Sequence, residues 1–156
     1  MALPEHPADR LPYGLNIYGL TYTVGFTWAK TPKANPKPLN ARQVIDQAAE
    51  WNLSWVEMPV SMLGEEAEAL RELRAHADAK RIRFVVAGGR VEAESLRRDL
   101  RVAAALGAPT VRCTLSGILC GDRRGFPGGW TAHLAGCTKA LEQVVPEAER
   151  LRVAIA

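Results

Sequence analysis

The sequence predicts an α/β fold that consists of about five parallel strands and four helices. Short apolar runs that are typical of buried strands alternate with segments in which apolar residues recur at helical spacing. Glycine, proline and asparagine separate most of these segments. The resulting order, β-α-β-α-β-α-β-α-β, requires crossover connections, which favour a parallel sheet covered by helices.

The expected strands are short runs of apolar and β-branched residues. In the first run, GLNIYGL, Leu15 and Ile17 alternate with Asn16 and Tyr18, which is the period of a strand. The expected strands lie at residues 14–20, 54–60, 81–89, 109–115 and 150–156. Residues 1–13 are expected to be a flexible lead, and residues 14–156 one domain.

The first expected helix carries both a start and a stop signal. Asn40 is a good N-cap, and Gln43 stands where the partner in a capping box would be. Asn52 tolerates the left-handed conformation and is a plausible stop. Trp51 and Trp55 flank the turn from this helix to the next strand and are expected to pack in the core.

Three further helices are expected, at residues 65–80, 91–107 and 130–145. The second of these ends at Gly107, a residue typical of helix C-termini. Pro146 is expected to kink or restart the third, because proline cannot donate a helical hydrogen bond.

Two architectures fit this order of elements. One is a flavodoxin-like doubly wound sheet, and the other is part of a (β/α)8 barrel, which needs about 250 residues when complete. A doubly wound nucleotide-binding domain needs a short turn after its first strand. Here residues 29–40 are expected to form a long loop rich in proline and lysine. No helix follows the fifth expected strand in the sequence. The sequence therefore favours a partial (β/α)8 barrel.

Composition excludes several classes of partner. The 156 residues are 47% hydrophobic and carry a net charge of +3, which is too small and scattered to predict nucleic-acid binding. No stretch approaches the ~20 apolar residues of a membrane span, and the proline-rich N-terminus lacks a signal-peptide core. Three cysteines, an odd number, predict reduced thiols and a cytoplasmic protein.

Three segments together resemble the xylose isomerase-like barrels, the superfamily of sugar-phosphate isomerases and epimerases and of endonuclease IV type enzymes. The helix-turn-strand step AAEWNLSWVEMPV is similar to the entry into strand two of that family. SLRRDLRVAAALGAPTVRC is similar to its third helix, A-x-x-L-G-A turn and fourth strand. AERLRVAIA resembles its fifth strand, which usually continues as E-N-H. The resemblance covers the N-terminal part of the barrel.

The resemblance also implies a divalent metal, Mg²⁺, Mn²⁺ or Zn²⁺, at the C-terminal mouth of the intact barrel. Its usual ligands are a Glu that ends strand five and an Asp or Glu, a His and a Glu from strands six to eight. Here Ala156 follows Ile155, and no sixth strand follows. The expectation is therefore a barrel truncated before its metal site, with no metal bound by this chain and no activity of its own.

Glu57 and Arg112 are the main candidate site residues. Glu57 lies between the apolar Val56 and Met58, and Arg112 between Val111 and Cys113, so both share the phase that faces the lumen of a barrel. Glu57 is the candidate catalytic residue, and Arg112 the candidate cation for an anionic or hydroxylated substrate. The alternative is an ion pair between the two, because an inward charge must be compensated.

Three other residues are candidates for substrate binding. Thr114 and Asn16 share the lumen phase of strands four and one. Trp28, in the loop after strand one, is the aromatic residue best placed to face a substrate.

Three functions therefore remain open from the sequence. The first is a metal-dependent isomerase or epimerase that acts on a small sugar or sugar phosphate. The second is a non-catalytic half-barrel that self-associates through its exposed strand edges. The third is a DNA-repair relative of endonuclease IV, for which the basic DNA-facing loops and metal-binding histidines are not evident.

Overall fold

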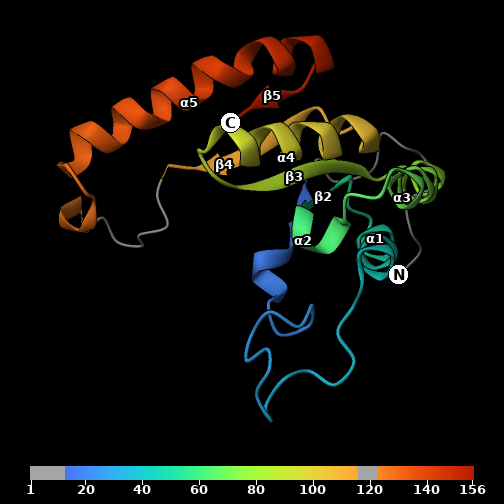
Figure 1. Ribbon diagram of the computed structural model, residues 1–156. Helices are drawn as coiled ribbons and strands as arrows, with labels where there is room; N and C mark the ends of the chain where they lie inside the picture. The colour runs from blue at the N-terminus through green and yellow to red at the C-terminus, as the bar shows by residue number, and fades with distance from the viewer. Residues whose placement is uncertain (1–12, 116–122) are drawn as a thin grey trace.

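A computed structural model describes residues 13–115 and 123–156 and shows a single parallel sheet (Figure 1). The five strands are β1 (Gly14–Asn16), β2 (Trp55–Pro59), β3 (Arg83–Arg90), β4 (Thr110–Thr114) and β5 (Ala154–Ile155). They pair in the order β1-β2-β3-β4-β5, every pair parallel. Sequential order is that of a barrel wall, so the partial-barrel prediction is confirmed and the doubly wound alternative is wrong.

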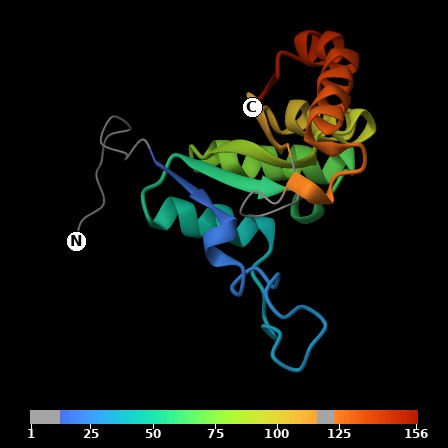
Figure 2. The same cartoon turned by 90° about the vertical axis from the view of Figure 1, so that its left-hand side faces the viewer.

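Four long helices form one layer outside this sheet (Figures 1 and 2). They are α1 (Ala41–Glu50), α3 (Ala67–Ala79), α4 (Ala93–Leu106) and α5 (Gly129–Leu151). Neighbours in this series contact each other in chain order, α1 with α3, α3 with α4 and α4 with α5. No helix within residues 13–115 and 123–156 is both long and apolar enough to cross a membrane.

The core lies between the sheet and these helices. The strand residues that face the helices are almost fully buried, namely Val56, Met58, Phe84, Val86 and Val111. The alternate residues of the same strands face the other way, because successive side chains of a strand point to opposite sides. We call that second side, which carries Asn16, Glu57, Ala87 and Arg112, the inner face.

The start and stop signals of α1 and the stop signal of α4 are confirmed. The Asn40 side chain accepts a hydrogen bond from the Gln43 N–H, and the Gln43 side chain accepts one from the Asn40 N–H, each at 3.0 Å. Asn52 and Gly107 adopt left-handed φ angles of 56° and 69° just beyond α1 and α4. These local rules set the limits of α1 and the end of α4.

Two elements differ from the expectation near the inner face. The first strand ends at Asn16 and gives way to a 3-10 helix, η2 (Ile17–Leu20), so Tyr18 is not a strand residue. The cause is Asn16, whose side chain accepts the Tyr18 N–H at 2.8 Å and so caps the helical turn. In addition, a short helix, α2 (Val60–Leu63), follows β2 directly.

Two expectations need correction: α5 does not restart at Pro146, and Trp51 at the end of α1 does not pack in the core. Helix α5 continues through Pro146, which is exposed. Proline has no N–H to donate to the carbonyl of Glu142, four residues earlier, but Glu142 is also exposed, so water can solvate that carbonyl. Trp51 is the C-cap of α1, beyond the helical turn that would direct it inward, and remains 49% exposed. Trp55 is half-buried, and the Arg83 guanidinium lies 3.8 Å from the centre of its ring.

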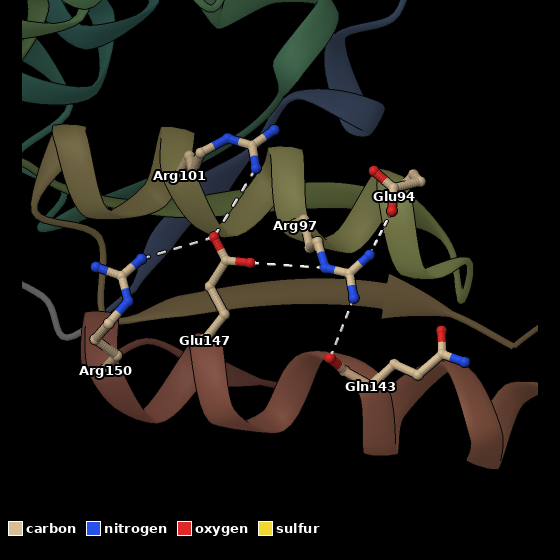
Figure 3. Close-up of polar contacts among 6 residues, drawn as sticks. All are labelled: Glu94, Arg97, Arg101, Gln143, Glu147 and Arg150. Atoms are coloured by element: carbon tan, nitrogen blue, oxygen red, sulfur yellow. Dashed lines mark hydrogen bonds and ion pairs between the residues drawn. The ribbon is translucent and has the colours of Figure 1, made fainter.

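A polar network joins α4 to α5 (Figure 3). The Glu147 carboxylate lies 3.8 to 3.9 Å from Arg97, Arg101 and Arg150. Arg97 also donates to the main-chain carbonyl of Gln143 at 3.3 Å. Each such pair is weak at a partly exposed surface, but together they fix the position of α4, which carries residues of the site described next.

Candidate functional site

An ion pair between Glu57 and Arg112 crosses the inner face. The register places Glu57 beside Val85 and Arg112 beside Ala87, so the two charged residues flank β3 and are offset by two positions. The strands that carry them, β2 and β4, lie ~10 Å apart, and the Arg112 Nε–H reaches across β3 to donate to Glu57 Oε1. The small side chain of Ala87 leaves room for this bridge. The predicted common side of these two residues is observed, and so is the ion pair that the sequence analysis gave as the alternative to a role in substrate binding.

Asn16 and Tyr18 extend this pair to β1. The Asn16 amide donates to Glu57 Oε2 at 2.9 Å, so each carboxylate oxygen has a donor. The Arg112 guanidinium also lies 6.0 Å from the centre of the Tyr18 ring, within the range of a cation–π contact. We call Asn16, Tyr18, Glu57 and Arg112 the inner-face cluster. Its carboxylate and guanidinium are only 17% and 34% exposed, so both are largely held by the protein.

The structure separates the other two candidates from this cluster. Thr114 lies at the end of β4 in the same phase as Arg112, but its hydroxyl donates to the carbonyl of Gly89 at 3.3 Å. Trp28 is 55% exposed, and its ring contacts Tyr22 and Lys33 of its own loop. Trp28 is therefore not brought together with Glu57.

A cavity of about 490 Å³ lies beside the cluster, at the C-terminal ends of β2 and β3. Tyr18 of the cluster forms one side of it. The rest of its wall comes from the segment after β2, the end of β3 and one residue of α4: Pro59, Val60, Ser61, Gly64, Glu65, Ala87, Gly88, Gly89 and Arg98. The C-terminal edge of a (β/α)8 sheet is where such barrels place their sites.

A buried carboxylate supports one wall of this cavity, and the sequence analysis did not find it. Asp99 of α4 is fully buried. Its Oδ1 accepts bonds from Arg98 Nε at 2.9 Å and Nη2 at 2.7 Å, and its Oδ2 accepts the Gly89 N–H at 3.3 Å. A signal was present: Asp99 falls on the apolar face that Leu96 and Leu100 define, where a charged residue needs a partner.

A methyl group at Gly88 would collide with this carboxylate. A Cβ there would lie 2.8 Å from Asp99 Oδ2 and 3.0 Å from both the Arg112 carbonyl and a Val111 methyl. Gly88 and Asp99 are thus a matched pair that shapes the end of β3, where the pairing with β4 shifts register between Ala87 and Arg90.

Side chains that could bind a metal are not clustered in the described part of the chain. No group of three or more His, Cys, Asp or Glu side chains gathers within residues 13–115 and 123–156. Burial raises the pKa of the Cys113 thiol, which lowers its value as a ligand or nucleophile. Cys120 and residues 1–12 lie outside the described part of the chain.

Comparison with known proteins bears on the fold. No protein-family profile and no curated protein matches this sequence. Among solved structures, the chain is similar to D-psicose 3-epimerase, crystallised in the presence of D-fructose, with a TM-score of 0.67 and 14% identity. The match covers 93% of this chain and 51% of the epimerase chain, so this chain spans about half the length of that protein. The chain therefore has the fold of part of a (β/α)8 barrel.

Proposed function

We propose that this chain provides part of a sugar-binding site of the isomerase and epimerase type, in which the inner-face cluster binds hydroxyl groups of a small ketose. The observation that carries the proposal is the hydrogen-bonded chain from Asn16 through Glu57 to Arg112 beside the 490 Å³ cavity. The fold of a sugar epimerase, shared over 93% of this chain, supports it.

The cluster is suited to hold hydroxyl groups in fixed positions. A carboxylate offers about four lone-pair positions, so Glu57 retains two acceptor sites after it binds Asn16 and Arg112. Arg112 uses its Nε–H on Glu57 and keeps its terminal N–H groups as donors. Because each charged group orients the other, little conformational entropy remains to be lost when a sugar binds.

Within such a site, Glu57 is the candidate for proton transfer. Epimerisation next to a carbonyl requires a base and polarisation of that carbonyl. In the family that the sequence resembles, a divalent metal supplies the polarisation. The described residues do not assemble a ligand set for a metal, so we derive no step through one. Trp28 is left out of the proposal, because its contacts lie within its own loop.

Titration of ¹⁵N-labelled protein with D-fructose, followed by NMR, tests the proposal. We expect saturable shifts at Asn16, Tyr18 and Arg112, and their loss in Glu57→Gln. Glu68→Gln is the matched control, because Glu68 also pairs with an arginine, Arg71, but on the exposed surface of α3. Saturable shifts that persist in Glu57→Gln, or no shifts in the unmodified chain, would refute it.

A second candidate function is self-association without catalysis. A groove of about 450 Å³ lies beside β5, lined by Leu141, Val145, Val153 and Ile155 among others. Val145 is 44% exposed, so the groove presents an apolar side chain that a second copy of the chain could cover. Light scattering over a concentration series tests this. Self-association that Val145→Glu abolishes would favour it, and a monomer at all concentrations would exclude it.

A further inference from the structure

We propose that Arg98 forms a second subsite in the 490 Å³ cavity, one that binds two neighbouring oxygens of a neutral sugar, and that Asp99 is the residue that positions it. The inference rests on the proposed function, because it assigns the far end of the same ligand. Two observations carry it, the edge of Arg98 that remains free and the balance of charge in the cavity.

The contacts of Arg98 leave one edge of its guanidinium unused by Asp99. Both of its bonds to Asp99, from Nε and from Nη2, end on the single oxygen Oδ1. A guanidinium has a second edge, formed by Nη1 and the outer hydrogen of Nη2, with two parallel N–H donors. The Arg98 side chain is 39% exposed and lines the cavity. No other residue within 13–115 and 123–156 binds this second edge, so it is available to a ligand with two adjacent oxygen atoms.

Asp99 fixes where this edge lies. Its carboxylate is fully buried between α4 and β3, and it is held from the other side by the Gly89 N–H. A buried carboxylate needs its charge partner, so Arg98 is bound to one position over the cavity wall. Gly88 has no side chain, which leaves space for the carboxylate to reach that position.

The charge balance favours neutral oxygens over an anion. Arg98 and Glu65 are the charged residues among those that line the cavity, and their formal charges cancel. The buried Asp99 carboxylate additionally neutralises the positive charge of the Arg98 guanidinium. A phosphate would therefore meet a site with no excess positive charge, whereas vicinal hydroxyls need donors and no net charge. The ligand class is an unphosphorylated polyol end, such as the far hydroxyls of a ketose.

The test compares two arginines of the same helix. Arg98→Lys keeps the charge that Asp99 needs but removes the planar pair of donors. Arg101→Lys is the matched control, because Arg101 lies three residues further along α4 and shares with Arg98 the groove between α3 and α4, but does not line the 490 Å³ cavity. Both variants, with the unmodified chain, are titrated with D-fructose and with D-fructose 6-phosphate, and the Arg98 Nε–H signal is followed by NMR.

We expect Arg98→Lys to weaken D-fructose binding by about tenfold, and Arg101→Lys to leave it within about twofold. The Arg98 Nε–H signal of the unmodified chain should shift as D-fructose binds, which a purely structural role would not cause. Unchanged affinity in Arg98→Lys overturns the subsite and leaves the proposed function standing. Tighter binding of the phosphate ester overturns the choice of a neutral ligand. A chain that binds neither sugar refutes the proposed function itself, and the subsite with it.

A variant without charge checks that loss of binding is not loss of folding. Arg98→Gln combined with Asp99→Asn removes both charges but keeps an acceptor for the Gly89 N–H. We expect this double variant to fold, as shown by its circular dichroism, and to bind D-fructose as weakly as Arg98→Lys. Full affinity in the folded double variant would contradict the proposal.

Discussion

Arg112 on β4 and Glu57 on β2 are joined across β3, and each satisfies the charge of the other. We expect Arg112→Met to lower the free energy of unfolding by about 2 kcal/mol, because it leaves a mostly buried carboxylate with the Asn16 amide alone. Adding Glu57→Gln should restore part of that loss, which yields a coupling energy of about 1 kcal/mol. Urea denaturation of the unmodified chain, of each single variant and of the double variant measures this coupling energy. Strictly additive effects would mean that the pair contributes nothing to stability.

Gly88 and Gly89 provide a matched test of the packing around Asp99. Gly88→Ala should destabilise the protein by about 2 kcal/mol, because the new methyl group overlaps the carboxylate and two neighbouring groups. Gly89→Ala should cost well under about 1 kcal/mol, since a Cβ there meets no atom within 4 Å. Thermal unfolding of both variants separates them. Equal losses would show that the cost comes from chain conformation and not from contact with Asp99.

Asp46 of α1 should make stability depend on pH at the acid end. Burial alone would raise the pKa of this carboxyl, but hydrogen bonds and charges from Lys80 and His76 outweigh it and hold the pKa below its usual value of 3.8. A lowered folded-state pKa contributes stability that is present above the unfolded value and is lost as pH falls through the folded one. The carboxylate is 40% exposed, so Asp46→Asn should cost only about 0.5 kcal/mol at pH 7.

The difference between Asp46→Asn and the unmodified chain should shrink as the pH falls below 3.8, and should vanish once the pH lies below the lowered folded-state pKa of Asp46. Chemical denaturation from pH 2 to pH 7 follows this convergence. Asp78→Asn serves as the control, because Asp78 lies 3.7 Å from Arg74 at the exposed surface of α3. A difference for Asp46→Asn that stays constant down to pH 2 would contradict the assignment.

We expect calorimetric titration of the 156-residue chain with Mg²⁺, Mn²⁺ or Zn²⁺ to show no stoichiometric site of micromolar affinity. The reason is that Glu57 already binds Arg112 and Asn16, and the described residues place no second and third ligand beside it. Glu57→Gln is the companion variant. A micromolar site that this variant removes would show that Glu57 binds metal and would replace the ion-pair account of the cluster.

The sequence was sufficient for the fold because its signals are local. Alternation of apolar residues set the phase of β2 and β4, and phase alone placed Glu57 and Arg112 on one face. The limits of α1 followed from Asn40 and Asn52, whose preferences depend on their own backbone. Sequential strand order then followed from the alternation of elements and from the long loop after the first strand.

The parts of the site that the sequence analysis missed depend on contacts between distant residues. Asp99 accepts a hydrogen bond from Gly89, ten positions away, and no local sequence pattern shows whether a buried carboxylate has hydrogen-bond donors. The strand signal of residues 14–20 was overridden by one hydrogen bond, which the Asn16 side chain accepts from the Tyr18 N–H. Trp28 was judged by residue type, but its left-handed φ of 55° and its contacts are properties of a folded loop.

The order of the strands also has a consequence for biosynthesis. Each strand pairs with the one made just before it, and each long helix packs against its predecessor in the same layer. A chain built in this way has partners close along the sequence, so little loop-closure entropy opposes each step. Every βα unit that leaves the ribosome can therefore dock on a surface that already exists, and the nascent protein can fold in the direction of translation.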